Sequence, residues 1–163
     1  MKKILFVCLG NICRSPMAEY VFKDIVKKEG KEKKFYIESA ATSTEEIGSD
    51  MHYGTKEILD RYNIPYKKHT ARQLKKEDYT KFDYIIGMDS GNIRGILRIV
   101  GEDNQNKVYK LLDFTDENRD IADPWYTGNF KKTYDDILKG CMALYNNIKW
   151  NSKGVNENGI YRI

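Results

Sequence analysis

The chain has 163 residues, of which 40% are hydrophobic and 32% are charged, and its formal net charge is +4. This length suits one domain with a sizeable core, which we expect over residues 1–150, and no apolar stretch is long enough for a membrane span or a signal peptide. The odd number of cysteines, three, argues against a disulfide framework, so we expect a cytoplasmic protein in a reducing compartment.

Predicted strands and helices alternate along the chain. Short apolar or β-branched runs predict strands over residues 3–7, 35–39, 84–88 and 108–111. Helical spacing of apolar residues predicts helices that begin at Pro16, end before Pro65, follow Asp89 and run through residues 134–148. In the helix after Asp89 the spacing places four side chains inward, namely Ile93, Ile96, Leu97 and Val100. This alternation predicts an α/β fold, a three-layer sandwich with a central four-stranded parallel sheet and helices on both faces.

The segment between the first predicted strand and the first predicted helix has the composition of a phosphate-binding loop. Its sequence is Cys8-Leu9-Gly10-Asn11-Ile12-Cys13-Arg14-Ser15. Ser15 followed by Pro16 predicts a helix start with Ser15 as the N-cap. The free N–H groups and the dipole of a helix N-terminus favour a phosphate dianion without a metal, and the guanidinium of Arg14 grips two phosphoryl oxygens. The same surroundings favour a thiolate, which makes Cys8 a candidate nucleophile.

The other loop residues suit this role. Gly10 allows close backbone approach or a positive φ, and Asn11 also tolerates the left-handed region, so the loop can turn its N–H groups inward. The Ser15 hydroxyl can donate to the Cys8 sulfur and ease its departure from phosphorus. Cys13 either captures an oxidised Cys8 as a disulfide or is a small buried side chain. A cysteine that ends a strand is usually a small hydrophobic residue, but the residues around Cys8 favour the nucleophile.

Asp123 is the candidate general acid, because the leaving group of a phosphate ester needs a proton. The alternative is an aspartate that forms a turn before proline. Other aspartates occur nearby, namely Asp113, Asp116 and Asp120. Only Asp123 is followed by a proline and two aromatic residues, Trp125 and Tyr126. These rings either belong to the core or wall a deep slot that selects phosphotyrosine over phosphoserine.

Several segments of the chain resemble the low-molecular-weight protein tyrosine phosphatases. The likeness lies in residues 7–19, Ser39-Ala40-Ala41-Thr42, Ile64-Pro65, His69-Thr70-Ala71-Arg72, residues 82–86, Met88-Asp89 with Asn92, and Asp123-Pro124-Trp125-Tyr126. It extends to about Trp150, and the polar tail of residues 151–163 lies beyond it. The resemblance implies phosphomonoester hydrolysis through a cysteinyl-phosphate, in which Cys8 attacks, Arg14 binds the phosphoryl group and Asp123 donates a proton.

The resemblance also implies a network that supports the loop, formed by Asn11, Ser39 and His69 with Ser15. One position departs from the family, since Glu45 stands where an aromatic residue is common. We therefore expect the slot to lack one wall at Glu45, and we expect Glu45 to repel anionic peptides and to give some preference for basic flanking residues. A metal role for the two histidines is disfavoured, because the cysteines lack the spacing of a zinc site.

Three other functions on this scaffold are disfavoured. Arsenate reductases need an additional pair of cysteines, and there is none between Cys13 and Cys141. Phosphoarginine phosphatases of the family carry threonine where Ile12 stands and lack the aromatic pair after Asp-Pro. A phosphate-binding module needs neither nucleophile nor acid. We expect a phosphotyrosine phosphatase without metal or cofactor, whose ligands are phosphotyrosine proteins, small aryl phosphates and inorganic phosphate.

Nucleic acid is not expected as a partner. Five lysines gather where the first helix should end, namely Lys27, Lys28, Lys31, Lys33 and Lys34. The run has no interleaved aromatic residues, whereas cations suit the C-terminal end of a helix dipole. We therefore interpret it as a solvated helix end.

Overall fold

The computed structural model describes residues 1–152 and contains the predicted parallel sheet. Its strands are β1 (Lys2–Cys8), β2 (Phe35–Ala41), β3 (Tyr84–Gly87) and β4 (Val108–Lys110), in the order β2-β1-β3-β4. All three strand pairs are parallel. Since β1 lies inside the sheet, its carboxyl end, which carries Cys8, is at the point where connections leave to both sides.

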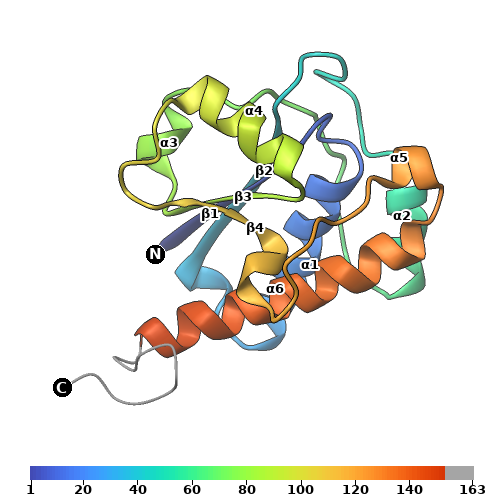
Figure 1. Cartoon of the computed structure of the whole chain (residues 1–163). Helices are drawn as coiled ribbons and strands as arrows, with labels where there is room; N and C mark the ends of the chain where they lie inside the picture. The colour runs from blue at the N-terminus through green and yellow to red at the C-terminus, as the bar shows by residue number, and fades with distance from the viewer. Residues whose placement is uncertain (153–163) are drawn as a thin grey trace.

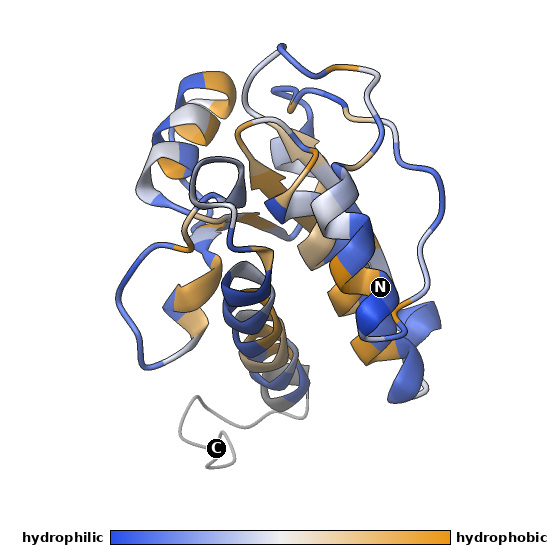
Figure 2. Cartoon of the chain, turned by 90° about the vertical axis from the view of Figure 1, so that its right-hand side faces the viewer, coloured by the Kyte–Doolittle hydropathy of each residue, from blue (hydrophilic) through white to orange (hydrophobic). Residues whose placement is uncertain are grey.

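Helices cover both faces of the sheet (Figure 1). The longer ones are α1 (Arg14–Lys28), α2 (Tyr53–Arg61), α4 (Ser90–Val100) and α6 (Phe130–Ser152). Ile4 and Phe6 of β1 pack in the core with α1 and α6, whereas Leu5 and Val7 pack with α4 on the other face. This alternation is the two-residue period of a strand buried on both faces, so the expected three-layer α/β sandwich is confirmed. In Figure 2 the strands and the inner sides of the helices carry most of the apolar colour.

Short elements that the sequence pattern did not predict connect these layers. They are η1 (Glu32–Lys34), α3 (Asp78–Lys81), η2 (Leu111–Phe114) and α5 (Pro124–Thr127). Each is three or four residues long, too short to show a helical period of apolar residues.

Two details of the predicted helices are wrong. Helix α1 begins at Arg14 with Cys13 as the N-cap, and not with Ser15, because the Ser15 side chain turns toward the Cys8 sulfur instead of capping the backbone. Leu97 of α4 is 36% exposed. Ile96 and Val100 already face the sheet, and Leu97 lies about 100° further around the helix.

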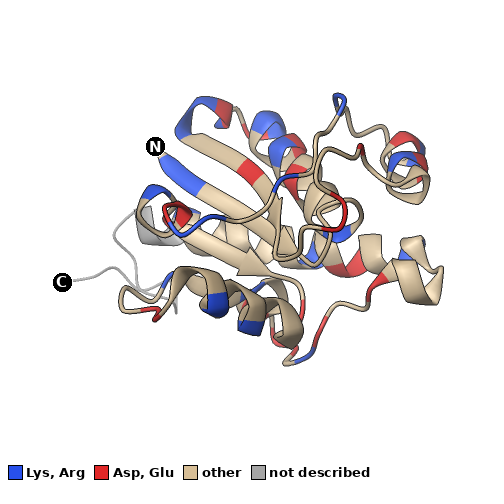
Figure 3. Cartoon of the chain, turned by 90° about the horizontal axis from the view of Figure 1, so that it is seen from above, with Lys and Arg blue, Asp and Glu red and all other residues tan. Residues whose placement is uncertain are grey.

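The last turn of α1 carries the predicted lysines, whereas the last helix, α6, extends beyond its predicted end. Lys27 and Lys28 occupy the last turn of α1, as expected, and Figure 3 shows basic and acidic residues interspersed on the helices. Helix α6 extends to Ser152, two residues into the predicted tail, and residues 153–163 lie outside the described part of the chain. Across residues 1–152, no helix is both long and apolar enough to cross a membrane.

Candidate active site

The loop after β1 surrounds the sulfur of Cys8 with donors. The backbone N–H groups of Asn11 and Ser15 point to Cys8 Sγ at N···S distances of 3.3 and 3.4 Å, and Ser15 Oγ lies 3.1 Å from the same sulfur. Asn11 has a φ of 59°, so the left-handed turn of the loop is at Asn11. Gly10 does not have a positive φ, and a Cβ there would meet only ordinary contacts. The expected freedom at Gly10 is therefore not what shapes the loop.

The strained turn at Asn11 is held by hydrogen bonds at every polar atom of its side chain. Its Nδ2 donates to Ser15 Oγ at 2.8 Å and to Ser39 Oγ at 2.9 Å, and its Oδ1 accepts from the Arg72 N–H at 3.1 Å. Its backbone oxygen lies 2.7 Å from Nε2 of His69, and because a carbonyl only accepts, Nε2 carries the proton. Asn11 is fully buried, so the network offsets the cost of a left-handed asparagine.

The network continues away from the loop. Ser39 Oγ donates to Glu19 Oε1 at 2.6 Å, and the other oxygen of this buried carboxylate pairs with Lys23 at 2.5 Å. On the other side, the backbone N–H of His69 donates to Asp50 at 2.9 Å. Ser39 and His69, which both contact Asn11, are thus each held by a further partner.

Arg14 lies beneath the pocket with its guanidinium almost fully buried. Nη1 donates to Asp89 Oδ2 at 2.7 Å and to the Ile121 carbonyl at 2.8 Å, and Nη2 lies 3.3 Å from Asp123 Oδ2. Burial opposes the charged form, but the charge of Cys8 and the hydrogen bond to Asp89 more than offset it, so the pKa of Arg14 lies above its ordinary value. The guanidinium therefore stays positively charged beside the sulfur.

Asp89 binds Arg14 with one carboxylate oxygen and caps helix α4 with the other. Its Oδ1 accepts from the N–H of Asn92, while Asn92 Oδ1 accepts from the N–H of Asp89, which is a capping box. Asp89 is therefore the N-cap of α4, and no local pattern indicates its contact with Arg14.

Asp123 begins the short helix α5 at the edge of the same pocket. Its Oδ1 accepts from the N–H of Trp125 at 3.0 Å, with Pro124 at the first helical position. The alternative acid, Asp120, instead pairs with Lys110 at 3.0 Å and is not among the residues that line the pocket. Of the aspartates weighed as the acid, Asp123 alone lines the pocket with Arg14.

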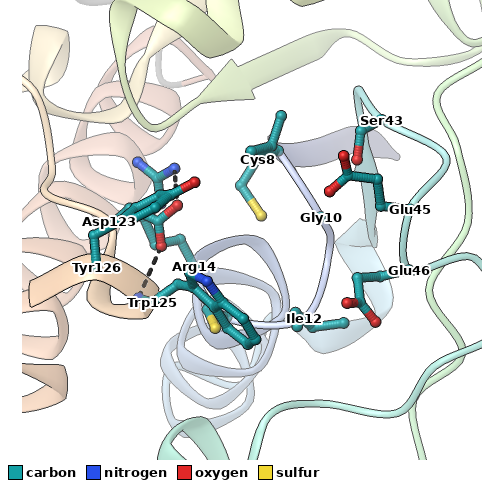
Figure 4. Close-up of a pocket in the computed structure, with 12 residues that line it drawn as sticks. Cys8, Gly10, Ile12, Arg14, Ser43, Glu45, Glu46, Asp123, Trp125 and Tyr126 are labelled. Atoms are coloured by element: carbon teal, nitrogen blue, oxygen red, sulfur yellow. Dashed lines mark hydrogen bonds and ion pairs between the residues drawn. The ribbon is translucent and has the colours of Figure 1, made fainter. Parts of the chain in front are cut away.

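The pocket above Cys8 has a volume of about 120 Å³. Its lining comprises Cys8, Leu9, Gly10, Ile12, Cys13, Arg14, Ser43, Glu45, Glu46, Asp123, Trp125 and Tyr126. Trp125 is 56% and Tyr126 78% exposed, so these rings form a wall and not part of the core. Figure 4 shows Glu45 and Glu46 across the pocket from Asp123 and the two rings. The Ser43 hydroxyl is buried and has no hydrogen-bond partner in the described part of the chain.

The three cysteines are free thiols in different surroundings. Burial, followed by the charge of Cys8, raises the pKa of Cys13 to about 12. Burial alone raises the pKa of Cys141, which packs in the core between α6 and α1. Among the described residues, no group of three or more histidine, cysteine or carboxylate side chains is arranged to hold a metal ion.

The structure therefore gathers the predicted loop, acid, wall and support residues around one pocket. It adds residues that sequence reasoning did not assign to the site, namely Glu19, Ser43, Glu46, Arg72, Asp89 and Ile121. Asp89 follows β3 at the carboxyl edge of the sheet, the edge where ligands bind in such folds. That topological rule and the family-like segment Met88-Asp89 were the signals available for it.

Known proteins share this sequence and fold. The sequence profile of the low molecular weight phosphotyrosine protein phosphatases matches residues 3–154. The Bacillus subtilis low molecular weight protein-tyrosine-phosphatase YfkJ is 43% identical over 151 residues, covering 91% of this chain and 97% of that protein. The YfkJ crystal structure has a TM-score of 0.89 at 42% identity, with coverage of 93% and 96%.

Two further relatives are more distant in source. The human low molecular weight phosphotyrosine protein phosphatase is 41% identical over 151 residues, covering 88% of this chain and 93% of that protein. A Drosophila arginine phosphatase has a TM-score of 0.81 at 29% identity, with coverage of 91% and 98%. From the profile match and the identity over most of its length, the chain belongs to the low molecular weight protein-tyrosine phosphatase family.

Proposed function

We propose that this enzyme hydrolyses phosphotyrosine in proteins through a cysteinyl-phosphate. The observation that carries the proposal is the convergence of Cys8, Arg14 and Asp123 on one pocket above a loop of inward N–H groups. A phosphoryl group seated there takes N–H donors from the loop and from Arg14, which turns from its aspartate partners toward the phosphoryl oxygens.

In the first step Cys8 Sγ attacks phosphorus and the bond from phosphorus to the tyrosine oxygen breaks. Asp123, as a carboxylic acid, gives its proton to the leaving phenolate. In the second step water attacks the cysteinyl-phosphate, the Asp123 carboxylate accepts a proton from that water, and Cys8 leaves as a thiolate. Ser15 Oγ, 3.1 Å from the sulfur, stabilises the departing thiolate by donating its hydroxyl hydrogen.

The shape of the pocket supports an aromatic substrate. Trp125 and Tyr126 stand exposed beside Asp123, where a flat ring that enters the pocket can stack between them and the loop. A phosphoserine has no ring to fill this space, and its shorter side chain would hold the phosphoryl group above the loop. Selectivity for phosphotyrosine follows from depth and stacking together.

Phosphoarginine is the second candidate, because an arginine phosphatase of Drosophila shares the fold. Glu45 and Glu46 line the pocket and would attract a guanidinium. The apolar side chain of Ile12 and the aromatic pair after Asp123 favour the phenyl ring instead. We also propose a reducing, cytoplasmic compartment, in keeping with the three free thiols.

A comparison of kcat/KM on matched phosphotyrosine, phosphoserine and phosphoarginine peptides, with EDTA and a reductant present, tests the proposal. We expect phosphotyrosine to be the best substrate and Trp125→Ala to reduce its kcat/KM, because the ring loses a stacking partner. Efficient hydrolysis of phosphoserine, or an undiminished rate on phosphotyrosine in the variant, would refute the aromatic wall. A preference for phosphoarginine would move the enzyme to the second candidate function.

A further inference from the structure

The aromatic wall continues outward from the pocket through residues that the catalytic steps do not use. The ring of His52 lies edge-on to Trp125, with centroids 5.6 Å apart, and stacks on Tyr53 at 4.3 Å. Tyr53, the first residue of α2, is 76% exposed. We name Trp125, His52 and Tyr53 the aromatic ledge, since their rings form one continuous run from the pocket to solvent.

His52 holds the ledge in place through three different segments. Its backbone N–H donates to the Ile12 carbonyl of the loop at 2.9 Å, and its Nδ1 accepts from the N–H of Gly54 at 3.0 Å. Its ring also stacks on Phe130 at the start of α6, with centroids 5.1 Å apart and an angle of 17°. A Cβ on Gly54 would come within 2.5 Å of the Phe130 ring, so only glycine lets that ring approach α2. The ledge is therefore a preformed surface.

The charge at the mouth of the pocket is negative and not neutralised. Glu45 and Glu46 line the pocket, and neither carboxylate forms an ion pair within the described residues. Arg14, the only cation in the lining, is paired with Asp89 and Asp123 and would face the phosphoryl group of a substrate. A substrate segment that leaves the pocket thus meets aromatic faces on one side and the carboxylates of Glu45 and Glu46 on the other, of which Glu46 accepts a hydrogen bond from Ser49 Oγ (Figure 4).

We propose that the aromatic ledge is a docking surface for an arginine that flanks the phosphotyrosine of a protein substrate. This inference rests on the proposed function and adds the sequence context of its substrate. A guanidinium stacks on the faces of tryptophan and tyrosine and pairs with a carboxylate through its planar fork, which no apolar or acidic side chain can do. An extended peptide advances roughly 3.3 Å per residue, so an arginine two or three positions from the phosphotyrosine reaches Tyr53.

The test measures kcat/KM on phosphotyrosine peptides that carry a single arginine at each of the three positions before or after the phosphotyrosine, with alanine peptides as the reference. We expect an arginine preference of about two- to fivefold, the size of a cation–π contact at an exposed site, at a position two or three residues away. Tyr53→Ala should bring this ratio close to one, whereas Tyr53→Phe, which keeps the ring, should retain it. Added salt should weaken the preference, because Glu45 and Glu46 contribute to it.

His52→Asn distinguishes the role of the His52 ring in the ledge from the role of the His52 side chain as the N-cap of α2. Asparagine still accepts from the Gly54 N–H but has no ring, so the arginine preference should fall without loss of the α2 start. Met142→Ala, on the exposed side of α6 far along the chain, is the matched control and should keep the preference.

Several results would overturn the proposal. One is an arginine preference that is absent in the parent enzyme or survives both Tyr53→Ala and His52→Asn. Better hydrolysis of a leucine peptide than of the arginine peptide would assign the ledge to an apolar partner. A change in sedimentation caused by Tyr53→Ala without substrate would assign it to a second copy of the chain. If the alanine peptides are not hydrolysed at all, the proposed function itself fails and the docking proposal falls with it.

Discussion

Replacement of Asp123 by asparagine separates proton donation from the structural role of this residue. In the structure Asp123 Oδ1 accepts from the Trp125 N–H at 3.0 Å, and the side chain is 21% exposed. Asparagine can keep that hydrogen bond, so α5 and the aromatic wall should stay in place. Alanine also removes the cap, which typically costs about 1 kcal/mol. The asparagine variant is therefore the cleaner test of the acid.

The loss expected for Asp123→Asn depends on the leaving group. General acid catalysis contributes about 10²- to 10⁴-fold, so kcat/KM on phosphotyrosine should fall by about 10²-fold or more, equal to about 2.7 kcal/mol of barrier. The phenolate of an aryl phosphate with an acidic phenol leaves without a proton, so kcat/KM on that substrate should fall by about tenfold or less. The contact with Arg14 is long, at 3.3 Å, so its removal should change the free energy of unfolding little.

The assay is kcat/KM, which reports the steps up to departure of the phenol, for a series of aryl phosphates whose phenols differ in acidity, measured on the parent, Asp123→Asn and Asp123→Ala. The parent should show a weak dependence on phenol acidity and both variants a steep one. Equal losses on all substrates would refute Asp123 as the acid, and the same series on Asp120→Asn would then test the alternative.

Three further predictions follow from the loop and its supports. Cys8→Ser should abolish turnover, because a serine hydroxyl at this position stays protonated and is a poor nucleophile, while phosphate should still bind. Activity within about tenfold of the parent, with EDTA present, would exclude covalent catalysis by Cys8. Peroxide should oxidise Cys8, which then forms a disulfide with Cys13. Because the pKa of Cys13 is raised to about 12, the disulfide should form faster as pH rises, and the activity of Cys13→Ser should recover only in part when thiols are added. Mass spectrometry that maps the disulfide elsewhere, or a rate of formation independent of pH, would contradict this prediction. Asp89→Asn should keep the α4 cap and lower the free energy of unfolding by about 1 kcal/mol, the difference between a charged and a neutral hydrogen bond to Arg14. Asp89→Ala also removes the cap and should lower the free energy of unfolding by about 2 kcal/mol or more. Equal urea midpoints for the two variants would show that the cap contributes nothing.

The layers of the fold were predictable because each strand and long helix has its own apolar pattern. Residues 4–7 are apolar without alternation, which is typical of a strand buried on both faces, and Ile4 and Leu5 do pack on opposite sides of the sheet. The boundaries were less predictable. Helix α1 begins at Arg14 because the loop continues directly into the helix, whereas Ser15, the best capping residue by type, contacts the Cys8 sulfur.

The core of the site was predictable because the nucleophile and the phosphate-binding loop are adjacent in sequence. Asp123 was found through its Pro-Trp-Tyr context, and the resemblance to a family supplied Ser39 and His69. The remaining partners act through distant contacts. Arg72 reaches Asn11 by a backbone N–H, and no side-chain pattern reveals a backbone donor. Likewise the aromatic ledge joins Tyr53 to Trp125 across the fold, and local spacing does not encode that contact.

The cysteinyl-phosphate is the central claim, and its direct observation is the most decisive measurement. Asp123→Asn should slow the second step, because it lacks the base that accepts a proton from water, so the intermediate should accumulate with an aryl phosphate that carries a good leaving group. Rapid acid quench followed by mass spectrometry of peptides should then find one phosphoryl group on Cys8, and none in Cys8→Ser. Turnover with EDTA present but no phosphoryl group on Cys8 at any time, or its appearance on Ser15 instead, would contradict the account.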